Sequence, residues 1–300
     1  MWNEVLRMLN AGDIKTLARM ISLVENQSPG YEELLQLLPK KHIRVIGITG
    51  PPGAGKSTLV DGMIASLTDQ RKKVGVLCID PSSAFNHGAL LGDRIRMSSW
   101  YLHPDVFIRS LATRGSMGGL HADIIEIVDV MNAFPFDYII IETVGVGQNE
   151  IEIAGLADLT AVVLVPEAGD EIQHMKSGLM EIADMFIVNK SDRPDADRFV
   201  NNLKQMLAPA FSGKQREIPI IKTVASAGSG IDQVAGTILS MLSDSDYTIP
   251  RHLELLAEKA WQLIQKKRMV GTSREMLKTK LLDQSGQADF NLYKFVAANS

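Results

Sequence analysis

Residues 44–58 read Arg-Val-Ile-Gly-Ile-Thr-Gly-Pro-Pro-Gly-Ala-Gly-Lys-Ser-Thr, an apolar run followed by a glycine-rich loop. The spacing Gly-x4-Gly-Lys-Ser, from Gly50 to Ser57, is the pattern of a loop that binds the phosphates of a nucleoside triphosphate. A glycine-rich turn without a ligand is the alternative, but the strand, loop and helix that the motif requires are all present in order. The predicted nucleotide-binding residues of this stretch are Gly50, Pro51, Pro52, Gly53, Ala54, Gly55, Lys56, Ser57 and Thr58.

Each residue type in this loop has a physical role in holding phosphate. The glycines allow successive backbone N–H groups to turn toward phosphate oxygens, which side chains would obstruct. Residues 56–70 have a helical pattern, and the positive end of that helix dipole faces the same anion. Lys56 is long enough to reach the β- and γ-phosphates, and the Ser57 hydroxyl is a suitable ligand for Mg²⁺.

A second motif identifies the base. The apolar run that begins at Met185 closes with Asn189-Lys190-Ser191-Asp192, which fits the pattern Asn-Lys-x-Asp. Guanine presents N1–H and N2–H as adjacent donors and the Asp192 carboxylate accepts both, whereas adenine would place a lone pair there. We expect the Lys190 ammonium to contact the backbone of the phosphate loop. The motif alone is a common turn, but its place at a strand end after a phosphate loop predicts GTP rather than ATP.

The composition is that of an ordinary globular protein and excludes several classes. The 300 residues, 45% hydrophobic and 22% charged, are enough for one or two domains. The net charge of −4 gives no basic footprint, so no nucleic-acid partner is expected. No uncharged apolar run of about 18 residues is present, so no membrane span is predicted. The single cysteine, Cys78, and an N-terminus without a secretion signal predict a cytoplasmic protein with a buried, inert thiol.

The hydrophobic pattern predicts an α/β fold, a mostly parallel sheet wrapped by helices, with helical extensions at both ends. Between residues 43 and 243, short apolar runs alternate with amphipathic stretches. The runs are continuously apolar, so both faces of the sheet should be covered. The predicted strands are 43–49, 74–79, 106–110, 138–142, 161–166, 185–189 and 219–223.

We predict three parts along the chain. They are a helical extension at 1–40, made of two or three short helices, a GTPase domain at 41–248, and a helical segment at 249–300. Residues 251–283 read as helical, with an apolar stripe that either folds onto the domain or serves another subunit. The stripe consists of Leu253, Leu255, Leu256, Trp261, Leu263 and Ile264.

Three acids follow predicted strands and are candidates for arranging a metal ion and water. Asp80 directly follows the second strand, Asp93 lies in the adjoining loop, and Glu142 ends the fourth strand. Because ligands bind beyond the carboxyl ends of parallel strands, these acids should lie near the nucleotide. Taken singly, each acid is equally a helix cap or a solvated loop residue. We predict a Mg²⁺ site of Ser57, Asp80, Asp93 and Glu142, and a catalytic set of Lys56 with the three acids.

The loops after these strands hold further candidates for switching and hydrolysis. Gly145 offers its N–H to a γ-phosphate and would leave when that phosphate is hydrolysed. Gln148 is a candidate for positioning the attacking water, although Asp80 or Asp93 would serve equally. Lys176 would reach phosphate only if a partner moved its loop inward, and a solvated lysine is the alternative.

Together these motifs resemble the metallocentre-chaperone GTPases of the SIMIBI class. More narrowly, they resemble the methylmalonyl-CoA mutase-associated GTPases, the MeaB/ArgK group also labelled LAO/AO transport ATPases. The resemblance covers roughly residues 40–245, and its most specific part is Glu-Thr-Val-Gly-Val-Gly-Gln at 142–148. The segments that carry it are 50–58, 80–83, 91–93, 142–148 and 189–192.

The resemblance implies a GTPase chaperone that gates adenosylcobalamin delivery to an acyl-CoA mutase and protects or reactivates that enzyme. It also implies bound GTP or GDP with Mg²⁺, and a homodimer held largely by C-terminal helices. In this family Asp80, Asp93 and Glu142 would arrange Mg²⁺ and water, and residues 170–176 would form a partner-sensing switch loop.

The chain departs from the family pattern in the loop that backs the guanine. We align Val224-Ala225-Ser226 with it, but this stretch does not open with the usual Ser-Ala pair, which occurs later as Ser226-Ala227. Guanine O6 would still accept hydrogen bonds from backbone N–H groups of this loop. The predicted contacts are therefore Val224, Ala225 and Ser226.

Two other functions are compatible with a phosphate loop. A kinase would move the γ-phosphate onto a metabolite or protein, and a nucleotide-holding scaffold would show no turnover. A soft-ligand metal chaperone is excluded, because one cysteine and scattered histidines cannot build a thiolate site. No Asp-x-His-x-x-Gly string is present, so any cobalamin dependence should lie in the partner.

Overall fold

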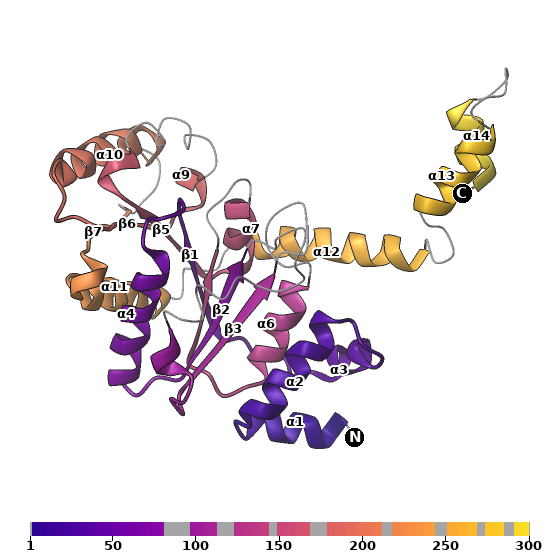
Figure 1. The fold of residues 1–300 in the computed structure, drawn as a ribbon, viewed down its shortest axis with the longest axis horizontal. Helices are drawn as coiled ribbons and strands as arrows, with labels where there is room; N and C mark the ends of the chain where they lie inside the picture. Colours follow the sequence, from indigo (N-terminus) through magenta and orange to yellow (C-terminus); the bar gives the residue numbers. More distant parts are fainter. Residues whose placement is uncertain are drawn as a thin grey trace. The chain divides into compact units, whose positions relative to one another are not determined.

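The structure, a computed structural model, describes residues 2–80, 97–112, 123–143, 149–168, 179–211, 218–243, 251–268, 274–284 and 291–299. The chain divides into two compact units, Met1–His252 and Leu253–Ser300. The first unit contains a β-sheet with the helices that cover it, and the second consists of helices (Figure 1).

Within the described residues, seven strands form one sheet in the order β3-β2-β4-β1-β5-β6-β7, and every neighbouring pair is parallel. This arrangement confirms the predicted α/β class. The first strand of the chain therefore lies at the centre of the sheet. The strands are β1 (Arg44–Thr49), β2 (Val74–Asp80), β3 (Val106–Ala112), β4 (Tyr138–Glu142), β5 (Leu159–Leu164), β6 (Met185–Val188) and β7 (Ile220–Lys222).

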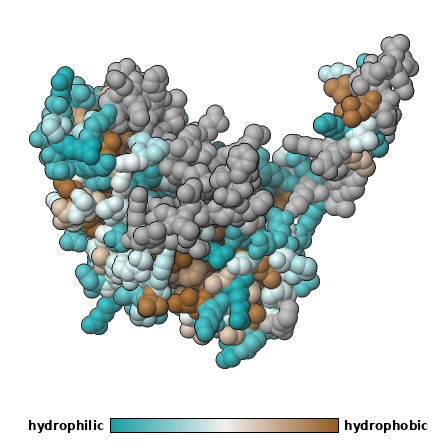
Figure 2. All heavy atoms as spheres, in the orientation of Figure 1, coloured by the Kyte–Doolittle hydropathy of each residue, from teal (hydrophilic) through white to brown (hydrophobic). Residues whose placement is uncertain are grey.

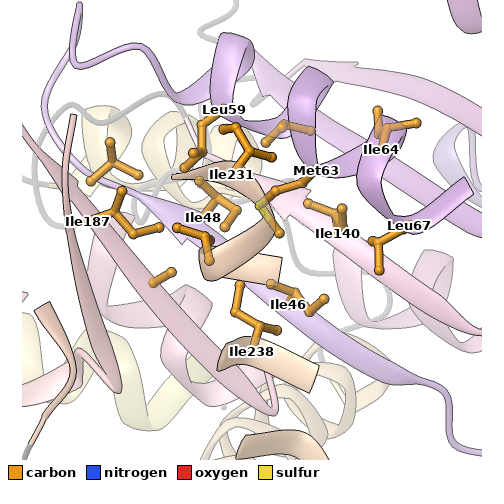
Figure 3. Close-up of a cluster of buried hydrophobic side chains, with 14 of the residues drawn as sticks. Ile46, Ile48, Leu59, Met63, Ile64, Leu67, Ile140, Ile187, Ile231 and Ile238 are labelled. Carbon is orange, nitrogen blue, oxygen red and sulfur yellow. The ribbon is translucent and has the colours of Figure 1, made fainter. Parts of the chain in front are cut away.

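One face of the sheet is covered by α4 (Lys56–Asp69) and α11 (Ile231–Ser243) (Figure 1). The apolar residues of α4 recur at helical spacing and point at the sheet, where they meet Ile46 and Ile48 of β1 (Figure 3). Burying each such side chain stabilises the fold by about 1.5–3 kcal/mol. This packing fixes α4, and with it the loop before α4, against the central strand. The α4 residues in the cluster are Leu59, Val60, Met63, Ile64 and Leu67.

The opposite face is covered by α6 (Ile124–Asn132), α7 (Asn149–Leu156), α9 (Leu179–Ile182) and α10 (Ala196–Phe211). Helix α7 approaches β1 closely because Gly47 has no side chain. A Cβ at Gly47 would lie 2.8 Å from Cγ1 of Ile153. Gly75 of β2 likewise lets the end of α6 approach the sheet, since a Cβ at this position would lie 2.4 Å from Cε of Met131. Both faces of the sheet are thus buried, as continuously apolar strands require.

The N-terminal helices are α1 (Trp2–Asn10), α2 (Ile14–Glu25) and α3 (Tyr31–Leu37) (Figure 1). Helices α2 and α3 pack against α6, and α1 packs against α2. The attachment is partly polar. The Arg109 guanidinium on the edge strand β3 donates to Glu25 Oε2 at 2.6 Å and to Ser22 Oγ at 3.0 Å. Gln27 donates to Asp123, the residue before α6, at 3.0 Å. These contacts hold α2 against the edge of the nucleotide-binding fold.

The second unit has three helices among its described residues, α12 (Arg251–Arg268), which begins just before the unit boundary, α13 (Arg274–Gln284) and α14 (Leu292–Asn299). Several apolar side chains of α12 are exposed, including Leu253, Trp261 and Ile264. Figure 2 shows hydrophobic residues at the surface of these C-terminal helices. Among the described helices of the whole chain, none is long and apolar enough to cross a membrane.

Candidate functional site

The phosphate loop joins the end of β1 at Thr49 to the start of α4 at Lys56. Gly50 has φ 135°, and a Cβ there would lie 2.0 Å from the carbonyl oxygen of Val163 in β5. Gly55 has φ 89° and precedes α4 without supplying a side-chain cap. Both positions need glycine, Gly50 for a close backbone approach and Gly55 for a left-handed turn at the helix N-terminus. The positive end of α4 therefore opens into the loop.

Lys56 is buried and folds back over the loop. Its Nζ donates hydrogen bonds to the carbonyl oxygens of Gly50, at 2.8 Å, and Pro51, at 3.0 Å. The Ala54 N–H donates to the same Pro51 carbonyl at 3.3 Å. A cation held at the rim of a glycine loop and a helix N-terminus makes a site suited to phosphate oxygens.

Ser57 and Glu142 meet below the loop. The Ser57 hydroxyl donates to Oε1 of Glu142 at 2.6 Å, and both residues are buried. A buried hydroxyl beside a carboxylate is a set of hard oxygen ligands, so these residues fit Mg²⁺, either directly or through its bound water. Next to them, the hydroxyl of Thr143 donates to that of Thr49 at 2.8 Å, which ties the end of β4 to the end of β1.

The Asn-Lys-x-Asp motif is joined directly to the phosphate loop. Asn189, which follows β6, donates through Nδ2 to the Ala54 carbonyl at 2.8 Å. Lys190 donates through Nζ to the Gly53 carbonyl at 2.7 Å, as its sequence position predicts. Lys190 adopts φ 55°, a left-handed conformation that is costly for a residue with a side chain. The two motifs, far apart in the chain, therefore form one continuous site.

Asn189 also organises the loop that follows β7. Its Oδ1 accepts hydrogen bonds from the Thr223 hydroxyl at 3.1 Å and from the Ala225 N–H at 3.0 Å. The Val224 N–H donates to Ser229 at 3.0 Å. Of the three predicted O6 contacts, Val224 and Ala225 thus use their N–H groups within the protein. Ser226 is exposed, and the described residues contain no partner for its backbone N–H.

Asp192 lies exposed at a turn whose ends are held in place. The Arg193 N–H donates to the Lys190 carbonyl at 3.1 Å, and the Ser191 N–H donates to the Thr223 carbonyl at 3.0 Å. The Arg193 guanidinium pairs with the carboxylate of Glu167. This pairing lowers the pKa of Glu167, and the charge of Lys190 adds to the effect. Two cations therefore lie near an acid beside the turn that carries Asp192.

Not every predicted residue falls within the described part of the chain. Asp80 is the last residue of β2 and pairs with Ala112 of β3, but its side chain is not among those that the structure describes. Asp93, Gly145, Gln148 and residues 170–176, which include Lys176, also lie outside it. Among the described side chains, no three His, Cys, Asp or Glu residues form a metal-binding cluster. The structure thus brings together Ser57 and Glu142 of the predicted metal set.

Several contacts of the site have no recognisable signal in the sequence. Thr223 and the Thr49–Thr143 pair support the loops through side-chain hydroxyls. Both threonines of that pair end or follow an apolar strand, the same position that singled out Glu142, but a threonine there is unremarkable in sequence. The pairing of Glu167 with Arg193 joins turns after two different strands, so no local pattern marks it.

Comparison with known proteins gives the family. The sequence profile described as "Methylmalonyl Co-A mutase-associated GTPase MeaB" matches residues 17–282. A protein of Pyrococcus abyssi named as a GTPase is 45% identical over 240 residues, which cover 78% of this chain and 74% of that protein. A Caenorhabditis elegans protein named "Methylmalonic aciduria type A homolog, mitochondrial" is 37% identical over 206 residues, covering 63% of this chain and 52% of the relative.

A solved structure agrees on the fold. The crystal structure of an LAO/AO transport system kinase aligns over 99% of this chain and 95% of its own, with a TM-score of 0.65. At 22% identity this likeness concerns the fold alone. The matched profile, by contrast, spans most of the chain, including the phosphate loop and the Asn-Lys-x-Asp turn. The chain belongs to the family of methylmalonyl-CoA mutase-associated GTPases, MeaB.

Proposed function

We propose that this chain is a Mg²⁺-dependent GTPase that gates adenosylcobalamin loading into an acyl-CoA mutase of the methylmalonyl-CoA type and protects that enzyme. One observation supports the nucleotide part most strongly. Asn189 and Lys190 bond to the carbonyls of Ala54 and Gly53, so the base-reading turn and the phosphate loop form one site. Membership of the family supports the link to methylmalonyl-CoA mutase, and the relatives named as GTPases support hydrolysis.

In this proposal each end of the nucleotide is recognised by different groups. The Asp192 carboxylate accepts from guanine N1–H and N2–H, and the Ser226 N–H donates to O6. Lys56 exchanges its carbonyl partners for the β- and γ-phosphates. These contacts orient the triphosphate along the N-terminus of α4, where the helix dipole favours negative charge.

The metal site proposed here contains Ser57 and Glu142, with Asp80 and Asp93 as further ligands or as the acids that orient water. Mg²⁺ bound there supplies positive charge that stabilises the transferring phosphoryl group. The Ser57 hydroxyl lies 2.6 Å from Glu142 Oε1, so Glu142 can hold the hydroxyl, or a water, in the orientation that a metal ligand needs. We also propose that the Gly145 N–H donates to the γ-phosphate.

The decisive experiment is GTP hydrolysis with Mg²⁺, measured alone and with an equal concentration of an adenosylcobalamin-dependent acyl-CoA mutase. We expect slow turnover alone and a large stimulation by the mutase, because a contribution supplied by a partner is worth up to about 10³–10⁵ in other GTPases. Lys56→Ala is the matched negative control and should lose the triphosphate while retaining a native circular dichroism spectrum.

Each other outcome assigns a different function. No turnover with or without the mutase would indicate a nucleotide-holding scaffold. A phosphorylated metabolite or protein formed without the mutase would indicate a kinase. Turnover that the mutase leaves unchanged would place the partner elsewhere and overturn the chaperone proposal.

The choice of base is tested by Asp192→Asn. An asparagine at this position has an amide donor for the extra carbonyl of xanthine and cannot accept both guanine donors, so preference should move from GDP toward XDP. Asp195→Asn is the control, since Asp195 lies in the same turn at φ 65°, a conformation that asparagine tolerates. A variant Asp192→Asn that still strongly prefers GDP would remove Asp192 as the base reader.

We also propose that the chain forms a homodimer through the segment 249–300. Support comes from the apolar face of α12, where Leu253 is 71% and Ile264 is 47% exposed. Ile264→Glu should convert a dimer into a monomer in analytical ultracentrifugation, because it places a charge on the apolar face. Gln265→Glu, one residue along and outside that face, should leave the dimer intact. A wild-type chain that sediments as a monomer would contradict the proposal.

We also propose that this chain lies in the cytoplasm. Its support is the single cysteine, Cys78, which is buried in β2 and suits a reducing compartment. Fractionation of cells that make the native chain, with detection by antibody, would place it.

A further inference from the structure

The turn that carries Asp192 is not self-supporting. Lys190, at φ 55°, and Asp195, at φ 65°, are both left-handed residues that carry side chains. Each such conformation costs of order 1 kcal/mol and persists only where surrounding contacts hold it. The single backbone bond across the turn, from the Arg193 N–H to the Lys190 carbonyl, closes it but does not fix its position. That position must be set by contacts with neighbouring strands.

Contacts from both neighbours of β6 meet this turn. On the β7 side, the Ser191 N–H donates to the Thr223 carbonyl at 3.0 Å. On the β5 side, the Arg193 guanidinium pairs with Glu167 in η2 (Pro166–Ala168), a 3₁₀ helix that begins two residues after β5. The first contact is between backbone atoms and any sequence could make it. The second depends on the charges of two side chains.

We propose that Glu167 and Arg193 are positioning residues for guanine recognition. Their ion pair holds the Asp192 turn in place against the base, so the affinity for the nucleotide depends on the position of η2. This inference rests on the proposed function, since it assumes that the site binds a guanine nucleotide. Movement of η2 away from the turn releases Arg193 and lets Asp192 retreat from the base. The pair is thus a route by which the position of η2 affects nucleotide release.

The exposure of the two side chains sets the expected change in the rate of GDP release. The side chains of Arg193 and Glu167 are 44% and 51% exposed, so water and salt screen their attraction. Exposed ion pairs typically change an equilibrium by roughly 1.5- to 5-fold. Breaking this pair should therefore speed GDP release by that factor, a change suited to tuning exchange rather than abolishing binding. Lys190, whose charge also acts on Glu167, bonds separately to Gly53 and remains in place.

The test measures the dissociation rate of a fluorescent GDP analogue from the full chain. Glu167→Gln and Arg193→Gln should each speed dissociation about 1.5- to 5-fold, and the double variant should match the single ones, because both remove one interaction. Arg193→Lys keeps the charge and should stay close to wild type. Asp197→Asn breaks a comparable exposed pair, Lys222 with Asp197 at 2.7 Å, and should have no effect.

Two further readouts separate positioning of Asp192 from a general loosening of the fold. Hypoxanthine lacks the exocyclic amine of guanine, so Glu167→Gln should weaken GDP binding more than IDP binding. Raised salt should speed release from the wild-type chain more than from Glu167→Gln, because salt screens an exposed pair. Equal losses for GDP and IDP, unchanged rates, or multiplicative effects in the double variant would each overturn the inference. A wild-type chain that binds no GDP analogue would overturn the proposed function and this inference with it.

Discussion

Asn189 connects three segments of the site through one amide. Its nitrogen donates to Ala54 in the phosphate loop, and its oxygen accepts from Thr223 and Ala225 after β7. A carboxylate would lose the donor and a hydrocarbon would lose every bond, so only an amide of this size satisfies all these partners. The asparagine of the Asn-Lys-x-Asp motif therefore connects the phosphate loop to the loop after β7, whereas Asp192 is the residue proposed to bind the base.

The space around the loop glycines predicts unequal effects of alanine. A Cβ at Gly55 would lie 2.4 Å from Nδ2 of Asn189 and would break its bond to Ala54. At Gly53 a Cβ meets nothing within 4 Å, so only the left-handed backbone, φ 74°, opposes it, at roughly 1–2 kcal/mol. Gly55→Ala should thus weaken GDP affinity, measured by calorimetry, far more than Gly53→Ala. Equal losses of GDP affinity would contradict this role of the bond between Asn189 and Ala54.

Two buried threonines predict opposite effects of valine. The Thr160 hydroxyl in β5 is buried, and the described residues offer it no hydrogen-bond partner. Thr160→Val keeps the shape and removes that hydroxyl, so it should stabilise the fold by about 1 kcal/mol. Thr49→Val leaves the Thr143 hydroxyl buried without its acceptor and should cost about 1–3 kcal/mol. Urea unfolding measures both changes, and a destabilised Thr160→Val would refute the first.

At the scale of elements, the strands are the part that the sequence predicts best. The predicted 138–142 coincides with β4, and the other runs overlap their strands with ends displaced by a few residues. The run predicted at 161–166 is β5, Leu159–Leu164. It begins earlier because Leu159 and Thr160 pair with Ile46 and Gly47 of β1. Such boundary contacts come from distant residues and leave no trace in the local apolar pattern.

The order of the strands and the placement of the N-terminal helices were beyond sequence reasoning. Alternating strands and helices predict a parallel sheet, but many orders satisfy that pattern. In the structure β1 lies between β4 and β5, and α7 packs closely on β1 at Gly47. Both are contacts between distant segments, which the local pattern does not indicate. Likewise, nothing near Arg109 in the sequence indicates that its partner is Glu25 in α2.

The link between α2 and β3 predicts a stability cost. Arg109 and Glu25 are only 24% and 12% exposed, so removal of the arginine leaves a largely buried carboxylate. Arg109→Gln should lower the free energy of unfolding by roughly 1–3 kcal/mol. Arg7→Gln, which breaks the exposed pair with Glu4, should change that free energy little. Denaturant unfolding measures both free energies. Similar losses in the two variants would show that the pair of Arg109 and Glu25 does not hold α2 against β3.

At the scale of the whole molecule, one cluster makes stability depend on pH. Asp158, just before β5, accepts from His42 Nε2 at 2.8 Å, from Arg44 at 3.1 Å and from the Val45 N–H at 2.7 Å. The hydrogen bond to Asp158 raises the pKa of His42. Burial alone would raise the pKa of Asp158, but the bonds from His42 and Val45 outweigh it and lower that pKa.

The signs of these shifts define a pH window. A raised histidine pKa stabilises the fold below about 6.5 and the gain is lost as pH rises through the folded value. A lowered aspartate pKa stabilises above about 3.9 and the gain is lost as pH falls. The difference in unfolding free energy between wild type and His42→Gln should therefore be largest near pH 5–6 and shrink toward pH 8. A difference that does not vary with pH would exclude this ion pair.

The central position of β1 has a consequence for how the chain folds. Both neighbours of β1 in the sheet, β4 and β5, come later in the chain than β2 and β3, so its pairings close long loops. Folds dominated by such distant pairings form slowly. The carbonyl of Val163 beside Gly50 and the amide of Asn189 beside Ala54 arrive only when β5 and β6 are in place. Affinity for nucleotide should thus emerge with the slowest refolding phase, and a nascent chain released before β6 is made would carry an intact phosphate-loop sequence that binds nothing.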